Sequence, residues 1–297
     1  MRVGVIINPI SGRRGHRSST AADRIARAQA LAQNLDSTIT TRIELTKAPG
    51  HAVELARQFA ADRMDVVVVW GGDGTINQAA GPLIGSATAL GIVPAGSGNG
   101  LARGLGLRGT PEQAFRAALK APPVAIDVGF LADRHFLNLA GIGFDAAVAS
   151  TFGQGGRRGA LRYVVDAFST AWSYRCPTYM VKLNDQTLEG PRFLLTFANG
   201  REYGNGIVIA PDASPRDGWL DAIVVDAGAF PLQLWRTRRV FIRRNKPAAG
   251  VIRTRVRCAD VTGERLMCHV DGEPFEVSGT AHIRLATGKL LVRGHFI

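Results

Sequence analysis

A strand-like run that ends in a glycine-rich turn is the feature that most constrains this chain. Residues 65–70 read DVVVVW and are followed by Gly71, Gly72, Asp73, Gly74 and Thr75. A short continuous apolar run bounded by turn residues is typical of a strand covered on both faces, as in a parallel sheet. Because a helix-like segment follows, the glycines would bring backbone N–H groups and a helix N-terminus close to a phosphate. The alternative is a tight turn in which the glycines only supply positive φ angles.

Strand-like and helix-like segments alternate through the first part of the chain. The expected strands lie at 3–7, 38–45, 65–70 and 90–94, and the expected helices at 18–34, 50–63 and 74–83. This alternation is typical of an α/β domain built on a parallel sheet.

The pattern changes near residue 127, where strand-like segments follow one another with hairpin-type turns between them. The expected strands are 128–131, 135–140, 178–183, 192–198, 207–210, 220–225, 251–261 and 266–270, and two helices are expected at 161–174 and 230–244. We therefore predict an α/β domain over residues 1–126 and an antiparallel β domain over residues 127–289. The last strand, at 290–297, either ends the β domain or returns to the first domain.

Two further loops follow expected strands of the first domain. One is Pro94 to Gly100 (PAGSGNG), and the other is Asn8 to Gly12 (NPISG), with Arg13, Arg14 and Arg17 directly after it. Loops at the carboxyl ends of parallel strands converge on one crevice, where open α/β sheets bind ligands. The arginines either clamp phosphates or form a solvated basic loop. Gly96-x-Gly98 does not complete GxGxxG, because residue 101 is Leu, and GxxxxGK[ST] is absent, so these loops are not a dinucleotide fingerprint or a P-loop.

The charge of the chain favours anionic partners. Lys and Arg number 36 against 24 Asp and Glu, a net charge of +12 over 297 residues. Such an excess suits nucleic acid, an anionic membrane surface or phosphorylated small molecules. Nucleic acid is not expected, because no recognisable motif is present and aromatic residues make up only 7%. Basic faces at 230–244 and 251–258 either dock on anionic lipid or are simply solvated.

Targeting and cysteine patterns point to the cytoplasm. The three cysteines, Cys176, Cys258 and Cys268, are widely spaced and include no CxxC pair. We interpret them as reduced thiols rather than as a disulfide framework or a zinc site. The N-terminal apolar run ends at Asn8-Pro9, which is too early for a secretory signal.

Three motifs in this order resemble those of the diacylglycerol kinase and sphingosine kinase superfamily, and more closely its bacterial diacylglycerol-kinase-like lipid kinases. They are NPxSG at 8–12, GGDGT at 71–75 and PAGSGN at 94–99. The resemblance continues at 126–129, 138–145 and 211–221, and in Asp271-Gly272-Glu273. GGDGT alone is shared with NAD kinases and phosphofructokinases, whereas its combination with PAGSGN and a distal DGE is more specific.

The resemblance implies two domains with the active site in the cleft between them. The N-terminal domain would be a Rossmann-like, NAD-kinase-like α/β domain that binds ATP, and the C-terminal domain an antiparallel β-sandwich that binds the lipid. By the same resemblance, ATP and its Mg²⁺ would contact residues of the three loops and of one further strand end: Asn8, Ser11, Thr46, Gly71, Gly72, Asp73, Gly74, Thr75, Gly96, Ser97 and Asn99.

Two aspartates of the β-rich part also receive roles from the resemblance. Asp271 matches the family's proposed general base, which accepts the proton of the lipid hydroxyl as its oxygen attacks the γ-phosphorus. Without the resemblance, Asp271-Gly272 would first be a hairpin turn. Asp217 resembles the side-chain ligand of a structural Mg²⁺ loop, completed by the carbonyls of Ser214 and Trp219. The alternative is a turn in which Asp217 caps the backbone.

The sequence departs from the family pattern at Gln78, where many relatives have Glu, and at Gly100, where the bacterial diacylglycerol type often has Asp. The GSGN spelling at 96–99 resembles sphingosine-kinase-like members instead. We expect an ATP- and Mg²⁺-dependent lipid kinase with diacylglycerol as the first-choice substrate and a sphingoid base as the second. The alternatives are an NAD-kinase-like enzyme and a non-catalytic lipid-binding or membrane-docking relative. We further expect a cytoplasmic protein, peripherally associated with the inner face of the membrane, and leave open whether it is a homodimer.

Overall fold

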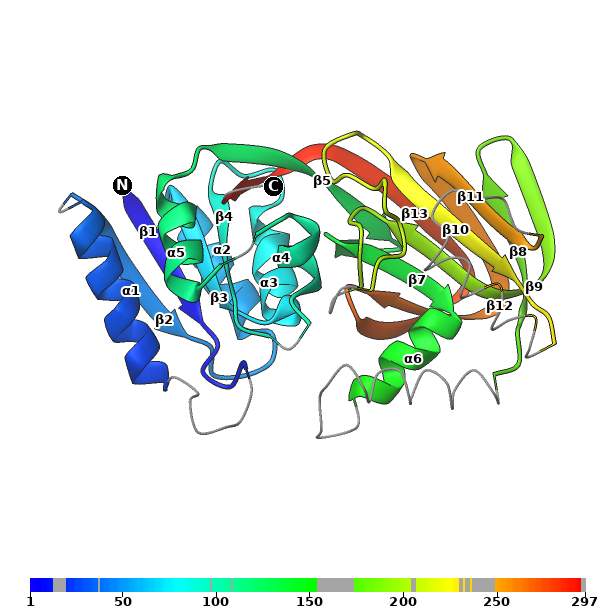
Figure 1. Ribbon diagram of the computed structural model, residues 1–297, viewed down its shortest axis with the longest axis horizontal. Coiled ribbons are helices and arrows are strands. Elements are labelled where there is room, and N and C mark those ends of the chain that lie inside the picture. Colours follow the sequence, from blue (N-terminus) through cyan, green and yellow to red (C-terminus); the bar gives the residue numbers. More distant parts are fainter. Residues whose placement is uncertain are drawn as a thin grey trace. The chain divides into compact units, whose positions relative to one another are not determined.

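The computed structural model describes residues 1–12, 20–36, 38–96, 98–107, 109–153, 174–203, 207–229, 232, 236 and 249–294. The chain divides into two units, one of Met1–Ile126 with Gly288–Ile297 and one of Asp127–Thr287. Figure 1 shows the helices and strands of both. Each unit is described by itself.

The first unit is a parallel sheet with helices on both faces. Its strands are β1 (Arg2–Ile7), β2 (Thr40–Leu45), β3 (Val66–Gly71), β4 (Ala89–Pro94) and the end of β13 (Glu273–Arg293). They lie in the order β2–β1–β3–β4–β13, and each neighbouring pair is parallel. The helices are α1 (Ala21–Leu35), α2 (His51–Ala61), α3 (Asp73–Ala80) with a 3-10 turn at Gly81–Leu83, α4 (Gly100–Gly104) and α5 (Pro111–Lys120).

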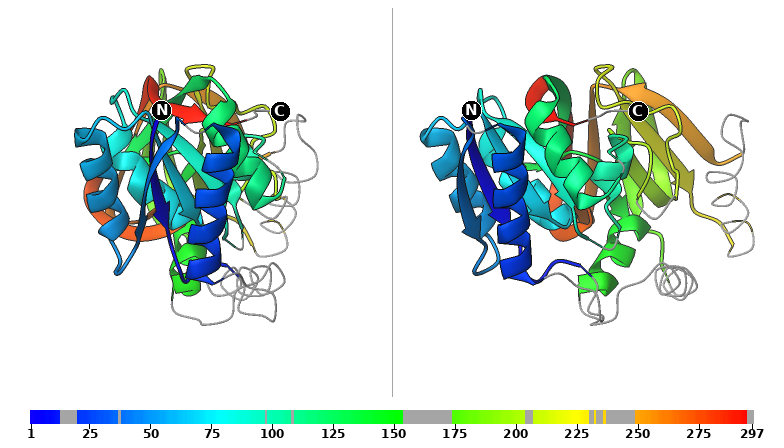
Figure 2. Two further views of the ribbon diagram at one scale, coloured as in Figure 1. Left: turned by 90° about the vertical axis from the view of Figure 1, so that its left-hand side faces the viewer. Right: turned by 60° about the vertical axis from the view of Figure 1, so that its left-hand side comes forward.

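Alternating side chains of this sheet pack on opposite faces. Val66 and Val68 of β3 join an apolar cluster with Leu31 of α1 and Phe115 of α5. On the other face α2 packs on β1, where a Cβ at residue 4 would lie 2.7 Å from the Phe59 Cγ, so that only glycine fits. Figure 2 shows α1 and α2 on the two sides of the sheet. Cover on both faces explains why a continuous run of valines forms β3.

Helix boundaries follow from capping side chains. Thr20 caps α1 and exchanges hydrogen bonds with Asp23, so the helix begins at Ala21 rather than at residue 18. Thr110 and Gln113 form the same capping box at α5, with Pro111 in its first turn. The helix α5 was not predicted, although both of these signals are present in the sequence.

The second unit is built on antiparallel strands. It contains the greater part of β5 (Pro123–Leu131) and of β13, with β6 (Arg134–Phe136), β7 (Leu139–Gly143), β8 (Thr178–Leu183), β9 (Gln186–Ala198), β10 (Leu220–Asp226), β11 (Val251–Val256) and β12 (Cys258–Val270). Antiparallel pairing joins β11 to β10, β10 to β9, β9 to β7, β7 to β12 and β12 to β13. The prediction of a β-rich C-terminal domain is thus confirmed. One helix, α6 (Phe144–Gly153), was not predicted.

Strands β7 and β8 both lie between β9 and β12, at different positions along those two strands. Strand β9 pairs with β8 over residues 186–191 and with β7 over residues 194–198. Strand β12 likewise pairs first with β8, over 259–262, and then with β7, over 268–270. Apolar side chains form one cluster that contains Ile142 and Leu195 and another that contains Leu139 and Leu194. The alternation along each strand therefore supplies an apolar cluster to each face.

Three strand predictions were wrong in detail. The strand expected at 135–140 is split, because the N–H groups of Leu137 and Asn138 donate to the Asp271 carboxylate instead of to a neighbouring strand. The strand expected at 251–261 breaks at Arg257, where the chain changes partner from β10 to β13. Residues 207–210 form only an isolated bridge, between Glu202 and Val208. The helices expected at 161–174 and 230–244 lie outside the described residues, apart from positions 174, 232 and 236.

Candidate functional site

The three loops predicted from the sequence lie at the carboxyl ends of neighbouring strands. Residues 8–12 follow β1, residues 71–75 begin at the end of β3, and residues 94–99 begin at the end of β4. The chain passes from β1 to β2 on one side and then to β3 on the other side of β1, so the strand order reverses between β1 and β3. In open α/β sheets, ligands bind outside the carboxyl ends of the strands at such a reversal.

Asn8 connects the first loop to the second. Its Nδ2 donates a hydrogen bond to Thr75 Oγ1 at 2.8 Å, and its backbone N–H donates to the Trp70 carbonyl at 3.0 Å. Its Oδ1 accepts the Ile10 N–H at 3.0 Å, which closes the turn of its own loop. The structure therefore brings two of the predicted nucleotide-site residues, Asn8 and Thr75, into direct contact.

The second and third loops meet backbone to backbone. A Cβ at Gly96 would lie 2.9 Å from the Gly72 Cα, closer than real Cβ contacts, so this approach requires glycine. The Ala95 N–H donates to the Gly71 carbonyl at 2.8 Å. Gly72 is also the N-cap of α3 and has no side chain to cap the first turn. Uncapped N–H groups at a helix start are donors suited to an anion.

Asp73 holds the third loop from the first residue of α3. Its Oδ2 accepts the Gly100 N–H at 3.1 Å and its Oδ1 accepts the Leu101 N–H at 3.3 Å. Asn99 has a left-handed φ of 48°, and its Oδ1 accepts the Gly96 N–H at 2.8 Å. The contact with residue 100 uses only the backbone, so the departure from the family pattern at Gly100 leaves this connection intact.

The other predicted nucleotide residues lie in the same region with one exception. Ser11 Oγ donates to the Asn8 carbonyl at 2.9 Å. Thr46, directly after β2, donates its N–H to the Ile7 carbonyl at 3.0 Å, which places it at the carboxyl end of the strand beside β1. Ser97 lies outside the described residues.

Arg24 of α1 supports the first loop and was missed by the sequence analysis. Its side chain donates to the carbonyl of Asn8 at 2.8 Å, to Ser11 Oγ at 2.9 Å and to the Ser11 carbonyl at 2.7 Å. The residue is 5% exposed, and burial lowers the pKa of its guanidinium. The alanine-rich sequence of this helix gives no indication that the Arg24 side chain is buried.

Asp271 lies on the turn between β12 and β13. Its φ is 48° and that of Gly272 is 88°, so both residues are left-handed. Its Oδ2 accepts the Leu137 N–H at 2.8 Å, and its Oδ1 accepts the N–H groups of Asn138 at 2.9 Å and Leu139 at 3.0 Å. Three backbone N–H groups of residues 137–139 therefore fix the Asp271 carboxylate, while the backbone of Asp271 forms part of the turn.

Asn199 stabilises the same segment and was also missed. It is fully buried, and its Nδ2 donates to the carbonyls of Leu137 at 2.8 Å and Asp127 at 2.9 Å. The N–H groups of Asn199 and Gly200 both donate to the Asn138 carbonyl at 2.8 Å. Residues 137–139 therefore donate N–H groups to Asp271, and the carbonyls of Leu137 and Asn138 accept hydrogen bonds from the 199–200 segment.

The predicted metal loop forms a turn beside Arg255 of β11. The Asp217 N–H donates to the Ser214 carbonyl at 3.4 Å, and Asp217 Oδ1 accepts the Trp219 N–H at 3.0 Å. Asp217 Oδ2 lies 3.7 Å from an Arg255 nitrogen. Nearby, the buried Oδ2 of Asp221 has no hydrogen-bond partner. Burial raises the pKa of Asp221 more than Arg255 lowers it, and Asp217 raises it further.

The arginines of the 251–258 segment are exposed, and they also contact this same region. Arg253 donates to the Ile209 carbonyl at 3.1 Å, and burial lowers the pKa of its guanidinium. The Arg257 guanidinium carbon lies 4.6 Å from the centre of the Trp219 ring, a cation–π distance. The basic stretch at 230–244 lies outside the described residues except at positions 232 and 236.

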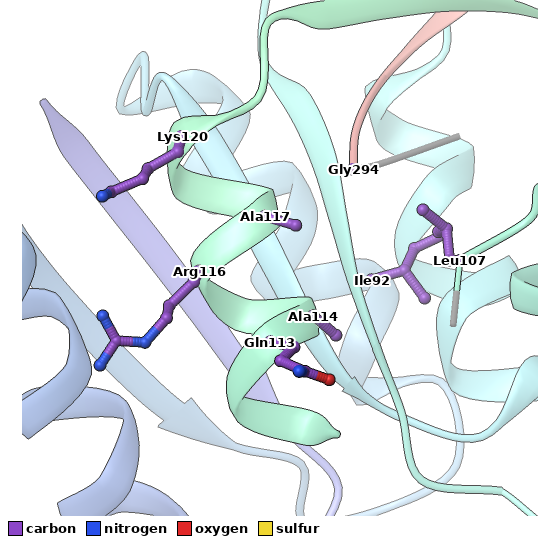
Figure 3. A pocket seen from close by; sticks show the side chains of 8 residues that line it. All are labelled: Ile92, Leu107, Gln113, Ala114, Arg116, Ala117, Lys120 and Gly294. Carbon is purple, nitrogen blue, oxygen red and sulfur yellow. The ribbon is translucent and has the colours of Figure 1, made fainter. Parts of the chain in front are cut away.

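A pocket of about 440 Å³ lies in the first unit between α5, β4 and the residues after α4 (Figure 3). Ala114 and Ala117 of α5 face Ile92 and Leu107, whereas Arg116 and Lys120 extend to the other side of the helix. None of the lining residues belongs to the three loops: Ile92, Leu107, Gln113, Ala114, Arg116, Ala117, Lys120 and Gly294. The pocket is thus separate from the candidate site.

Two features are absent from the part of the chain that the structure describes. No helix there is long and apolar enough to cross a membrane. No group of three or more His, Cys, Asp or Glu side chains in the described ranges is arranged to hold a metal ion.

Comparison with protein families gives two matches that together span most of the chain. Residues 2–131 match the diacylglycerol kinase catalytic domain. Residues 138–291 match the YegS C-terminal NAD kinase beta sandwich-like domain. The second match covers more than half of the chain.

Similar proteins carry related names. "Probable lipid kinase YegS-like" of Chromohalobacter salexigens is 37% identical over 62% of this chain and 61% of its own length, so that alignment spans less than two thirds of the relative. "Diacylglycerol kinase" of Mycobacterium tuberculosis is 28% identical over 93% of this chain and 92% of its own.

A solved structure supports the fold. The crystal structure of a diacylglycerol kinase from Bacillus anthracis superposes with a TM-score of 0.75 at 20% identity, over 99% of this chain and 97% of that chain. At this identity the likeness establishes the architecture alone. With the loop motifs and the two domain matches, it leads to one conclusion: the chain belongs to the family of YegS-like lipid kinases and diacylglycerol kinases.

Proposed function

We propose that this protein transfers the γ-phosphate of ATP to the hydroxyl group of a membrane lipid. The observation that carries the proposal is the meeting of three glycine-containing loops at the β1/β3 strand reversal, through the Asn8–Thr75 hydrogen bond and the Gly72–Gly96 contact. Kinases of this family use ATP, and a reversal of this kind is where α/β sheets bind nucleotides.

In the proposed nucleotide site the backbone does most of the binding. The uncapped first turn of α3 presents N–H groups to phosphate oxygens, while Asn8 and Thr75 fix the spacing of two loops. Asp73 supplies a carboxylate, a ligand type that Mg²⁺ prefers. The chemistry that Mg²⁺ would supply there is neutralisation of the phosphate charge. Asp73 also keeps the third loop in place through Gly100 and Leu101.

Asp271 acts in this proposal as the general base. It accepts the proton of the lipid hydroxyl while that oxygen attacks the γ-phosphorus and the β–γ bridging oxygen leaves with ADP. The three N–H donors from residues 137–139 restrict the carboxylate to one orientation. A fixed orientation favours catalysis because the base need not be ordered during the reaction.

Diacylglycerol is the substrate that we propose first, and a sphingoid base is the second. The whole-length alignment with a protein named diacylglycerol kinase supports the first choice. The GSGN spelling at 96–99 supports the second. We also propose that the protein works in the cytoplasm at the inner face of an anionic membrane, which its net charge of +12 favours.

The Asp217 loop is proposed as a divalent-cation site. Its oxygen donors, the Asp217 carboxylate and the Ser214 and Trp219 carbonyls, are of the type that Mg²⁺ and Ca²⁺ prefer. The unpartnered, buried Asp221 Oδ2 beside the loop supports the proposal and adds a donor that the sequence analysis did not include. A cation there would stabilise the 211–221 segment and would take no part in phosphoryl transfer.

The test is transfer of labelled γ-phosphate from ATP with Mg²⁺ to a panel of micellar lipids: diacylglycerol, monoacylglycerol, sphingosine, ceramide and phosphatidylglycerol. We expect label in one lipid, with diacylglycerol labelled fastest. Label in NAD instead would make the protein an NAD kinase. If ATP binds and neither lipid nor NAD is labelled, the non-catalytic alternative holds. Sedimentation with phosphatidylglycerol and with phosphatidylcholine vesicles tests the membrane proposal, which requires binding to the former alone.

A further inference from the structure

A buried polar cluster contacts the turn that carries Asp271. Asp145, in the first turn of α6, accepts hydrogen bonds from Tyr203 Oη at 2.7 Å and from Thr196 Oγ1 at 2.9 Å, both at its Oδ2. His269 of β12 places its Nε2 3.1 Å from the same oxygen. Asp145 is 6% exposed and His269 is 2% exposed. A carboxylate buried so deeply is stable only with partners such as these.

The other ring nitrogen of His269 contacts the turn itself. The Gly272 N–H donates to His269 Nδ1 at 3.3 Å. Nδ1 must therefore carry a lone pair, which puts the proton of the neutral ring on Nε2, the atom that faces Asp145. The Nε2–H is not aligned as a good hydrogen bond to Asp145, so the contact between them is chiefly electrostatic.

The backbone makes room for this pair. Gly141 of β7 lies opposite His269 in the β7–β12 ladder. A Cβ at residue 141 would collide with His269 Nε2 and with Asp145 Oδ2. Only glycine at this position allows the His269 imidazole and the Asp145 carboxylate to lie 3.1 Å apart.

We propose that His269, in its Nε2–H form and oriented by Asp145, is a positioning residue for Asp271. It accepts the N–H of Gly272 and so stabilises a turn in which two consecutive residues have positive φ angles, a backbone that is strained for the aspartate. The inference rests on the proposed role of Asp271. His269 touches no reacting atom and acts only through the backbone of the turn.

The proposal distinguishes between substitutions at one position. In His269→Asn, the Asn Oδ1 is attached to Cγ, as Nδ1 is in histidine, so it can still accept the Gly272 N–H. In His269→Leu no acceptor remains. We expect His269→Leu to lower kcat about tenfold or more with little change in the KM for ATP. We expect His269→Asn to recover most of that loss.

His282 provides the matched control. It lies on β13 and pairs through Nδ1 with Asp260 at 2.7 Å, but it is exposed and far along the hairpin from residue 271. His282→Leu removes an imidazole–carboxylate pair from the same β12–β13 hairpin. We expect its kcat to equal that of the unmodified protein.

Two readouts do not depend on activity. With ¹⁵N-histidine labelling of the full chain, the His269 ring should show the Nε2–H tautomer, assigned by its loss in His269→Asn. The Gly272 amide should exchange slowly in the unmodified protein and in His269→Asn, and faster in His269→Leu. An Nδ1–H tautomer, or unchanged exchange and kcat in His269→Leu, overturns the inference. Full activity of Asp271→Asn overturns the base assignment instead, so the two failures are distinguishable.

Discussion

Replacing Arg24 by methionine should weaken the first loop of the nucleotide site more than any surface change on the same helix. The guanidinium makes three hydrogen bonds, to the Asn8 carbonyl, the Ser11 carbonyl and Ser11 Oγ, at 2.7–2.9 Å. Methionine keeps most of the apolar stem but supplies no donor. The Asn8 carbonyl still accepts from Ser11, whereas the Ser11 carbonyl loses the Arg24 bond.

The size of the effect follows from these bonds. Each hydrogen bond contributes about 1 kcal/mol net, and the Ser11 carbonyl loses a partner. The free energy of unfolding should therefore fall by about 2–3 kcal/mol. For a unit of this size that corresponds to a fall in Tm of roughly 5–10 °C. Because residues 8–12 lose their anchor, the KM for ATP should rise about tenfold while kcat changes less.

Arg27 gives the control one turn further along α1. It pairs with Glu112 at 2.7 Å but its side chain is 55% exposed, and exposed ion pairs contribute about 0–1 kcal/mol. Thermal unfolding and ATP-dependent initial rates should be measured for both variants. If Arg24→Met and Arg27→Met behaved alike in Tm and in KM, the account of how the first loop is held would be wrong.

Three further predictions test other parts of the account. Asp73→Asn should weaken Mg²⁺-dependent nucleotide binding by about tenfold or more and lower the Tm, because the N–H groups of Gly100 and Leu101 donate to different carboxylate oxygens and one of these is replaced by an NH₂ donor; unchanged ATP titrations would exclude the role. In the native protein a thiol reagent at pH 8 should modify exposed Cys258 and leave Cys268 intact, since burial raises the pKa of Cys268 to about 12; mass spectrometry that found Cys268 labelled first would contradict its burial. Mg²⁺ or Ca²⁺ should raise the Tm of the unmodified protein more than that of Asp217→Asn in the absence of nucleotide, and equal shifts would refute a cation site in that loop.

The sheet of the first unit was predictable because its signals are local. A run of four valines between Asp65 and Trp70, followed by glycines, gives both the strand and the direction in which it ends. The loops after β1, β3 and β4 could be assigned to one edge because parallel strands share their carboxyl ends. The contacts that connect them, such as that of Gly96 with Gly72, depend on Cα positions that no local pattern encodes.

What the sequence did not show are residues whose role depends on tertiary contacts. An arginine such as Arg24 on a helix is usually solvated, and only the packing of α1 directs its side chain towards Ser11. His269 has no metal-ligand spacing and gave no signal, yet it is buried beside Asp145, which is far away in sequence. The strand expected at 135–140 was interrupted by Asp271, more than a hundred residues later. The alternation of apolar residues within 135–140 cannot reveal a carboxylate that lies on the distant β12–β13 turn.

The most direct test of the central claim compares initial rates of phosphate transfer from ATP and Mg²⁺ to diacylglycerol in mixed micelles for the unmodified protein and for Asp271→Asn. ATP binding to each should be measured in parallel. The account predicts labelled phosphatidic acid from the unmodified protein, a loss of about 10²–10⁴-fold in kcat for Asp271→Asn, and nearly equal ATP affinity. Equal rates for both proteins, or ATP binding without transfer to any lipid hydroxyl, would contradict it.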